Sequence, residues 1–309
     1  MHSSLALAVL GLFTLASGCA RLGPLGAGLG ETLARDTAYA RSQSHETVSA
    51  VEREDEIVGE GIALPEFPAV LYRRQRNTTR APAVVFLPGR FAPEDQYESY
   101  GRALAARGFI VIVRGRYSWF YPDADLADDA VILGDWLIAR ADVDPARLAV
   151  VGHSMGGRDA IRAAAQDPRF AAVVAIEPGT IAKLPNGADV TSRLVAPLLL
   201  IGADEAYKGW EFCGRRGSNY ATYFDSARDG TIEVEIHGAD HVQVMDSPDA
   251  FGYGVCRVGS ADSMRVRTLA RSATVQFLAK RFQNGPDFVE DSSAFATTRV
   301  RTRTAAVSR

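Results

Sequence analysis

Residues 152–157 contain a serine in a setting that could make its hydroxyl a nucleophile. They read Gly-His-Ser-Met-Gly-Gly, with Ser154 at the third position. A short apolar run at 147–151 comes before them, as expected for a buried strand, and the alanine-rich stretch 158–166 after them is typical of a helix. Strand, sharp turn and helix in that order are the context of a nucleophile elbow. Because a serine at strained backbone angles needs small neighbours, the glycines also fit. The pattern predicts a reactive serine.

A serine hydroxyl needs a histidine base, and the base needs an acid that orients it. In chains with this elbow the acid follows the serine and the histidine comes last. His2 and His45 precede the expected core, and His153 lies in the elbow, pointing away from the side of the serine. His237 falls inside the expected last strand, whereas His241 falls just beyond it, in a loop that could swing over the serine. We therefore favour His241 over His237 as the base.

Two acidic residues stand where a triad carboxylate could be placed. Glu177 follows the apolar run 170–176, and Asp204 follows the next apolar run, 197–201. Both runs are expected strands, and a loop at either strand end can carry the acid of a triad. The residues themselves leave this choice open.

The negative charge that develops on a substrate oxygen requires backbone N–H donors. One is expected from Met155, directly after the serine, and the other from Arg90, in the loop that follows Leu87-Pro88-Gly89. Aromatic residues in loops at strand ends either line an apolar pocket or simply pack. The residues concerned are Trp119, Phe120, Tyr121 and Trp210.

Apolar runs and helical patterns alternate along the chain. This alternation predicts an α/β fold with a mostly parallel central sheet and helices on both faces. The expected strands are 46–53, 69–74, 83–87, 109–113, 147–151, 170–176, 197–201 and 231–237, and the expected helices are 94–107, 125–141, 158–166 and 264–282.

The termini have a different composition from the expected domain at 45–283. Residues 1–20 resemble a signal peptide, with an apolar core at 5–15, and Ala16-Ser17-Gly18-Cys19 is similar to a lipobox that would attach lipid to Cys19. Ordinary cleavage after Ala20 is the alternative. Residues 21–44 are expected to be a tether, and residues 284–309 a flexible polar tail.

Bulk composition narrows the class of protein. The chain has 309 residues, 47% of them hydrophobic, with a net charge of −3 and a pI near 6.0, so nothing indicates a nucleic-acid partner. No apolar run reaches the ~18 residues of a membrane span, so membrane contact is expected only through an N-terminal lipid. Three cysteines are present. If Cys19 carries lipid, Cys213 and Cys256 remain as a candidate disulfide, which an oxidising periplasm permits, or as two buried thiols.

Taken together, residues 81–282 resemble the α/β-hydrolase superfamily, and within it both the chlorophyllase-like and the polyester-hydrolase (cutinase-type) serine esterases. The segment at 87–90 resembles the oxyanion loop of both groups, and 152–157 is the polyester-hydrolase form of the elbow. The segments at 175–178 and 238–241, with both later cysteines, look chlorophyllase-like. Dienelactone-hydrolase-like proteins are similar in fold, but they use a cysteine nucleophile that this elbow lacks.

The two resemblances imply different acids. The chlorophyllase-like pattern implies Glu177, although that family has Asp there, and the polyester-hydrolase pattern implies Asp204. We favour Glu177 because more of the C-terminal half looks chlorophyllase-like. The resemblance implies hydrolysis of small or polymeric carboxylic esters through an acyl-enzyme, without a metal or organic cofactor. A silent binding lipoprotein and an amide or thioester hydrolase are the alternatives.

Overall fold

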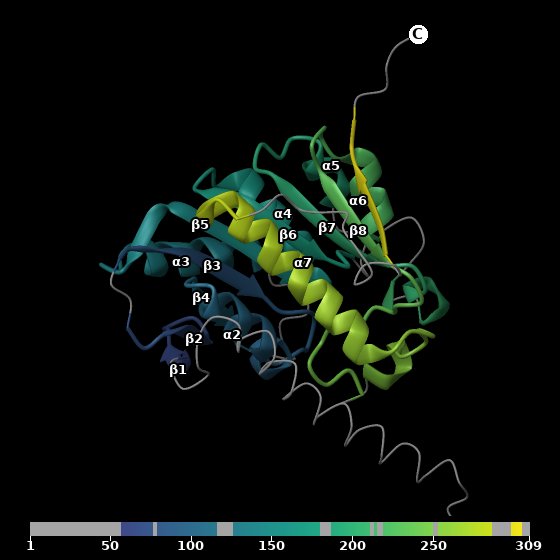
Figure 1. Cartoon of the computed structure of the whole chain (residues 1–309), viewed down its shortest axis with the longest axis horizontal. Helices are drawn as coiled ribbons and strands as arrows, with labels where there is room; N and C mark the ends of the chain where they lie inside the picture. The colour runs from purple at the N-terminus through teal and green to yellow at the C-terminus, as the bar shows by residue number, and fades with distance from the viewer. Residues whose placement is uncertain are drawn as a thin grey trace, which may run out of the picture.

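A computed structural model describes residues 57–76, 79–115, 126–179, 187–210, 213–214, 219–249, 253–285 and 298–304. These residues form one nine-stranded sheet with helices packed on it (Figure 1). The strand order is β1-β2-β4-β3-β5-β6-β7-β8-β9. The predicted α/β-hydrolase architecture, with a mostly parallel sheet, is confirmed.

The six strands β3 to β8 run parallel to one another, while β1, β2 and β9 are antiparallel to their neighbours. Every residue of β3, β4 and β7 is buried, which explains why their sequences are apolar throughout except for Arg114 at the end of β4. The strands are β1 (Ile57–Ala63), β2 (Pro68–Arg74), β3 (Ala81–Leu87), β4 (Ile110–Arg114), β5 (Val143–His153), β6 (Phe170–Ile176), β7 (Leu198–Ala203), β8 (Ile232–Ile236) and β9 (Thr298–Thr302).

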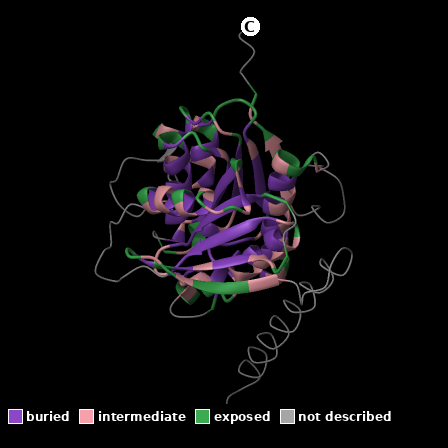
Figure 2. Cartoon of the chain, turned by 90° about the vertical axis from the view of Figure 1, so that its left-hand side faces the viewer, coloured by how far each residue is buried: buried purple, intermediate pink, exposed green. Residues whose placement is uncertain are grey.

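Two apolar clusters lie on the opposite faces of the sheet, and Figure 2 shows the buried interior between them. Side chains of α2 and α7 belong to one cluster, and side chains of α3, α4 and α6 belong to the other. The α-helices are α2 (Glu98–Ala106), α3 (Leu126–Ile138), α4 (Met155–Gln166), α5 (Gly187–Thr191), α6 (Tyr220–Ser226) and α7 (Ser263–Gln283). Short 3-10 helices are η2 (Glu94–Tyr97), η3 (Ala206–Lys208) and η5 (Tyr253–Cys256).

The ends of the sheet differ from the sequence expectations. The strand expected at 46–53 lies outside the described residues, as do the signal segment 1–20 and the tether 21–44. The partner of β2 is instead β1, Ile57–Ala63, a strand that the sequence analysis did not predict. Its Glu- and Gly-containing sequence is mostly exposed, as suits the outermost strand of a sheet.

The C-terminal segment also corrects a prediction. Within the stretch 284–309, which the sequence predicts to be a flexible polar tail, Thr298–Thr302 forms β9 and pairs with β8 along its whole length. Two arginines of this strand have partners on β8: Arg301 binds the fully buried Glu233, and Arg299 Nη2 lies 2.7 Å from Glu235 Oε2. Regularly spaced charge on this segment therefore marks a paired edge strand.

In the part of the chain that the structure describes, no helix combines the length and apolarity needed to cross a membrane.

Candidate active site

The elbow brings Ser154 to the carboxyl end of the central strand β5. Ser154 lies between the last residue of β5 and the first residue of α4, with φ 56° and ψ −120°, which is strained for a residue other than glycine. A Cβ on Gly152 would lie 2.1 Å from the carbonyl oxygen of Gly156, and a Cβ on Gly156 would lie 2.4 Å from that of Leu87. Only glycines therefore permit this turn.

The structure brings His241, and not His237, to the serine. His241 Nε2 lies 2.8 Å from Ser154 Oγ, and the imidazole is only 6% exposed. Burial lowers the pKa of His241 from 6.5 to about 4, so the ring is neutral near pH 7. A neutral imidazole with an unprotonated Nε2 can accept the proton of the serine hydroxyl.

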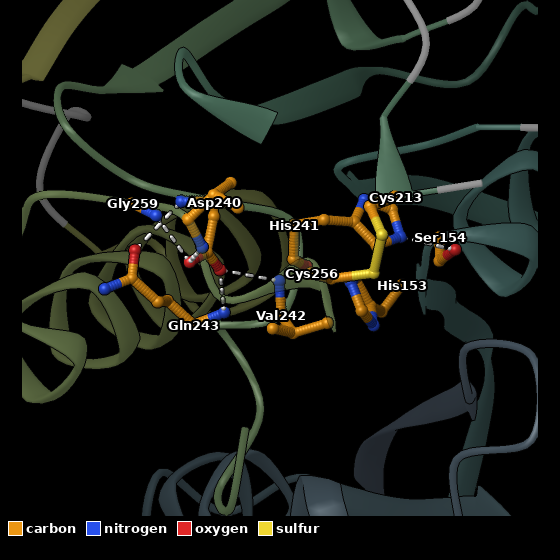
Figure 3. Close-up of a disulfide and its surroundings, with 10 residues drawn as sticks. His153, Ser154, Cys213, Asp240, His241, Val242, Gln243, Cys256 and Gly259 are labelled. Atoms are coloured by element: carbon orange, nitrogen blue, oxygen red, sulfur yellow. Dashed lines mark hydrogen bonds between the residues drawn. A yellow bond between two sulfur atoms is a disulfide. The ribbon is translucent and has the colours of Figure 1, made fainter. Parts of the chain in front are cut away.

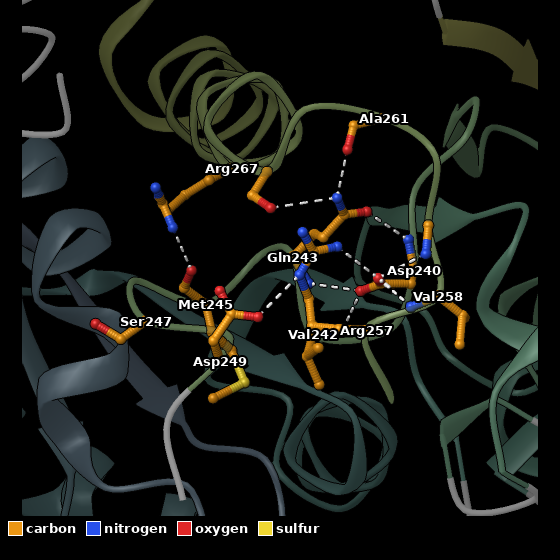
Figure 4. Close-up of polar contacts among 12 residues, drawn as sticks. Asp240, Val242, Gln243, Met245, Ser247, Asp249, Arg257, Val258, Ala261 and Arg267 are labelled. Atoms are coloured by element: carbon orange, nitrogen blue, oxygen red, sulfur yellow. Dashed lines mark hydrogen bonds and ion pairs between the residues drawn. The ribbon is translucent and has the colours of Figure 1, made fainter. Parts of the chain in front are cut away.

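Asp240 holds the loop that carries His241, a role that the sequence analysis missed. The carboxylate is fully buried, and it binds backbone on both sides of the loop (Figure 4). Its partners are the backbone N–H groups of Val242, Gln243, Val258 and Gly259 and the guanidinium of Arg257. The carboxylate therefore fixes the chain directly beside the imidazole. The only signal in the sequence was an acidic residue next to the favoured histidine.

Glu177 lies directly after β6, one strand away from the serine. It is 1% exposed, with φ 42°, and its Oε2 accepts a 2.7 Å hydrogen bond from the Ala203 N–H. Burial raises the pKa of Glu177 well above its ordinary range. Among the described residues, both Glu177 Oε1 and His241 Nδ1 are buried without a hydrogen-bond partner. Glu177 Oε1 can accept a hydrogen bond. His241 Nδ1 must carry the ring proton when His241 Nε2 accepts from the serine hydroxyl.

Asp204, the other acid considered, is engaged elsewhere. Its Oδ1 accepts a 2.7 Å hydrogen bond from the Gly238 N–H, and its Oδ2 lies 3.2 Å from His237 Nδ1. The side chains are 32% exposed for Asp204 and 49% exposed for His237. The two residues that were the second choices for acid and base therefore pair with each other at the surface.

The two expected oxyanion donors flank the serine. Met155 is the first residue of α4, and the leading N–H groups of a helix have no partner within it. Arg90 follows Gly89, and a Cβ on Gly89 would lie 3.4 Å from the Cβ of Ser154, so this loop runs directly beside the nucleophile. Phe91, the next residue, has φ 62°.

The aromatic residues proposed as pocket walls fall in two places. Trp210 is 66% exposed. Trp119, Phe120 and Tyr121 lie outside the described residues.

Cys213 and Cys256 form a disulfide, as the cysteine count suggested, with their Cα atoms 5.4 Å apart (Figure 3). Cys256 ends η5 and directly precedes the residues at 257–259 that bind Asp240. The bridge therefore supports the segment that anchors the loop of His241. No metal-binding cluster of histidine, cysteine and acidic side chains occurs within the described residues.

This arrangement is that of an α/β hydrolase with a serine nucleophile, and comparisons with known proteins give the family. A family model described as PET hydrolase-like matches residues 68–255, which is more than half of the chain. The chain belongs to this family of polyester hydrolases.

Individual relatives share about a third of their residues with this chain, over part of its length. Cutinase 1 of Thermobifida cellulosilytica is 33% identical over 141 residues, which are 44% of this chain and 51% of the relative. The cutinase of Thermobifida fusca (strain YX) is also 33% identical over 141 residues, 44% of each chain. The bis(hydroxyethyl) terephthalate hydrolase of Streptomyces coelicolor is 30% identical over 126 residues, 40% of this chain and 39% of the relative. The chain thus spans about half or less of the length of these curated relatives.

Proposed function

We propose that this protein hydrolyses carboxylic esters through Ser154, with His241 as the base and Glu177 as the orienting acid. The observation that carries the proposal is the 2.8 Å contact between His241 Nε2 and Ser154 Oγ at a strained elbow. Membership of the PET hydrolase-like family supports ester hydrolysis as the reaction class.

The reaction follows from the geometry. His241 Nε2 removes the proton of the Ser154 hydroxyl as the oxygen attacks the ester carbonyl. The N–H groups of Met155 and Arg90 stabilise the oxyanion of the tetrahedral intermediate, and each such donor contributes about 2.7–4 kcal/mol to lowering the barrier. The imidazolium then protonates the leaving alcohol. Water, deprotonated by the same nitrogen, releases the acid from the acyl-enzyme.

Glu177 is the acid that the burial pattern favours. The imidazolium of His241 is costly in a buried site unless a carboxylate faces Nδ1. Glu177 Oε1 is a buried carboxylate oxygen without a partner among the described residues, and Glu177 is held through Oε2 on the Ala203 N–H. A hydrogen bond from His241 Nδ1–H to Glu177 Oε1 would satisfy both atoms, and this is the contact that the proposed mechanism requires. Asp204 is less favoured for this role, because its two carboxylate oxygens contact the Gly238 N–H and His237.

The substrate class that we propose is a small or polymeric carboxylic ester. Relatives carry the names cutinase and bis(hydroxyethyl) terephthalate hydrolase, which favours esters over amides. Comparing each ester with the amide and thioester of the same acyl group tests this choice. A higher kcat/KM on the amide or thioester would reassign the enzyme to that bond.

We also propose that the protein is exported, with residues 1–20 as the signal and Cys19 as the lipid attachment site. The disulfide between Cys213 and Cys256 supports an oxidising compartment. Expression with a radiolabelled fatty acid tests the lipid, and Cys19→Ser is the control. Label that persists in Cys19→Ser, or a full-length chain in the cytosol, would contradict the proposal.

The decisive experiment uses p-nitrophenyl esters of increasing acyl length with wild type and Ser154→Ala. Wild type should show turnover and should react covalently with an active-site phosphonate, whereas Ser154→Ala should do neither. A folded wild type that neither hydrolyses any ester nor reacts with the phosphonate would overturn the proposal in favour of a silent binding protein. Full activity in Ser154→Ala would also overturn it.

A further inference from the structure

A chain of hydrogen bonds connects the oxyanion loop to the loop of the base, and the mechanism above does not use it. The N–H of Gly89 donates to Tyr97 Oη at 2.8 Å, and Tyr97 Oη lies 2.8 Å from His153 Nδ1. At the other edge of the ring, His153 Nε2 lies 2.8 Å from the backbone carbonyl oxygen of His241. The chain starts one residue before Arg90 and ends on the residue that contacts the nucleophile.

The direction of each hydrogen bond follows from its chemistry. A carbonyl oxygen only accepts, so His153 Nε2 must carry the proton that faces His241. Burial lowers the pKa of His153 to about 3, with a further contribution from the neighbouring His241 ring, so the ring is neutral and Nδ1 is an acceptor. Tyr97 Oη therefore donates to His153 Nδ1 while it accepts from Gly89. Because burial raises the pKa of Tyr97, its hydroxyl keeps the proton that this requires.

The neutral state of His153 matters for the reaction. The ring centroids of His153 and His241 are 5.0 Å apart, and Figure 3 shows both side chains beside Ser154. A charged His153 would repel the imidazolium that forms on His241 during acylation. The hydroxyl of Tyr97 lets His153 satisfy both ring nitrogens without taking up a second proton.

A second tyrosine holds the same loop from the opposite side. Tyr253 Oη donates a 2.7 Å hydrogen bond to the carbonyl oxygen of Phe91, whose φ of 62° is unfavourable without support. Tyr253 begins η5, the segment that ends at the disulfide. Backbone groups on both sides of Arg90, the N–H of Gly89 and the C=O of Phe91, are thus each bound by a tyrosine.

We propose that Tyr97, His153 and Tyr253 are positioning residues that fix the oxyanion donor of Arg90 relative to the base His241. This inference rests on the proposed function, because it assigns the alignment of that same site. The donor must lie within about 3 Å of the developing oxyanion, and small displacements of such groups reduce catalysis strongly. The positioning therefore acts on kcat and leaves KM nearly unchanged.

The test measures kcat and KM on one p-nitrophenyl ester for wild type, Tyr97→Phe, Tyr253→Phe and Tyr100→Phe. Tyr97→Phe keeps the ring and removes both bonds of the hydroxyl, so kcat should fall about 10- to 100-fold with KM within about threefold. Tyr253→Phe should lower kcat by about 5- to 10-fold, since it frees one side of the loop only.

Tyr100→Phe is the matched control. Tyr100 is a fully buried tyrosine that packs on Phe86, as Tyr97 does, but its hydroxyl donates to the carbonyl oxygen of Val244 at 3.0 Å. The kcat of Tyr100→Phe should stay within about twofold of wild type, although this variant also loses a buried hydrogen bond. Equal losses of kcat in Tyr97→Phe and Tyr100→Phe would reduce the effect to general destabilisation and overturn the inference.

Nitrogen NMR of the histidine rings gives a readout that packing alone would not change. Wild type should show His153 as the Nε2–H tautomer with Nδ1 accepting a hydrogen bond, and Tyr97→Phe should lose the Nδ1 signature. An Nδ1–H tautomer in wild type overturns the inference. If Tyr97→Phe does not fold, Tyr253→Phe decides, and an unchanged kcat overturns the positioning role.

The outcomes separate the inference from the function on which it rests. Wild type without any esterase activity overturns both. An active wild type with an inactive Ser154→Ala, together with an unchanged Tyr97→Phe, overturns the inference alone.

Discussion

Two sets of a histidine and a carboxylate follow the strands β6 to β8, and they lie in opposite environments. His241 and Glu177 are 6% and 1% exposed, and the imidazole touches Ser154. His237 and Asp204 have side chains 49% and 32% exposed, and they contact each other. By residue type and position at strand ends, either set could have completed a triad. Of these four residues, it is His241 that lies within hydrogen-bond distance of Ser154.

The difference shows how burial changes the properties of a histidine and an acid. The exposed pair is screened by water, and exposed contacts of this kind contribute only about 0–1 kcal/mol even when both groups are charged. The buried set has a lowered histidine pKa and a raised carboxyl pKa, both caused by burial. Perturbed groups of this kind are typical of active sites, because proton transfer needs a neutral base and a nearby acid that water does not screen. Burial, and not a contact between the two residues, is therefore the feature that favours His241 and Glu177 in the proposed triad.

The largest difference between the two sets should appear when each histidine is replaced in turn. His241→Ala deprives Ser154 of its base, and kcat/KM for a p-nitrophenyl ester should fall by about 10⁴- to 10⁶-fold. His237→Ala removes only an exposed contact and should stay within about twofold. Steady-state kinetics measures kcat/KM for both variants, once circular dichroism has shown that each folds like the wild type. A larger loss in His237→Ala than in His241→Ala would reverse the assignment of the base.

The acids provide the second contrast. Glu177→Gln keeps the shape and the hydrogen bond from Ala203 but cannot balance an imidazolium, so kcat should fall about 10³- to 10⁴-fold. Its Tm should stay equal or rise, because a buried carboxyl is replaced by a neutral amide. Asp204→Asn should change kcat by less than about threefold. A loss confined to Asp204→Asn would restore the acid position of the polyester-hydrolase pattern.

The sequence was sufficient where the signal is local. β6 has the predicted bounds, 170–176, because a buried parallel strand needs a continuous apolar run. The elbow was also predictable, since its glycines and the strand and helix patterns on either side of it lie within one continuous stretch, 147–166. The choice between Glu177 and Asp204 was not local, because both follow strands and only the packing around them differs.

Features that depend on distant partners were missed. Tyr97 and His153 are 56 residues apart, and His153 and His241 are 88 apart, so no spacing in the sequence indicates their hydrogen bonds. The sequence predicts a polar tail where β9 stands, because the acidic residues of β8 that bind Arg299 and Arg301 are 64 and 68 residues away along the chain. Hydrophobicity patterns along the sequence do not predict polar contacts between residues that are far apart in the chain.

The disulfide gives a third test, because Cys256 directly precedes the segment that anchors the loop of His241. Cys213 and Cys256 close a loop of 43 residues, next to the segment that binds Asp240. The double variant Cys213→Ser/Cys256→Ser should lose about 2–4 kcal/mol of unfolding free energy. For a domain of this size that lowers Tm by about 5–12 °C, which calorimetry measures. Dithiothreitol should lower the Tm of wild type similarly and leave the double variant unchanged. A wild type insensitive to the reductant after complete reduction of the bridge would contradict this role.

The pH profile should show the smallest effect, about tenfold, and it reports on the burial of His241 directly. The neutral imidazole is the active form, so activity is present above the pKa of the folded protein and is lost as the pH falls through it. Burial lowers that pKa from 6.5 to about 4, so kcat/KM should still be near its maximum at about pH 5.5, where an ordinary histidine would leave about a tenth.

The His237→Ala variant should have the same acid limb, because the His237 ring takes no part in the reaction. Circular dichroism at each pH separates protonation of the base from unfolding. An acid limb near pH 6.5 in a folded enzyme would mean that His241 is solvated, or that the ionised Glu177 required as orienting acid already stabilises the imidazolium in the resting enzyme. Repeating the pH profile with Glu177→Gln distinguishes these two explanations. If the charge of Glu177 sets the acid limb, the variant's limb moves to lower pH. If His241 is solvated, the limb stays where it is.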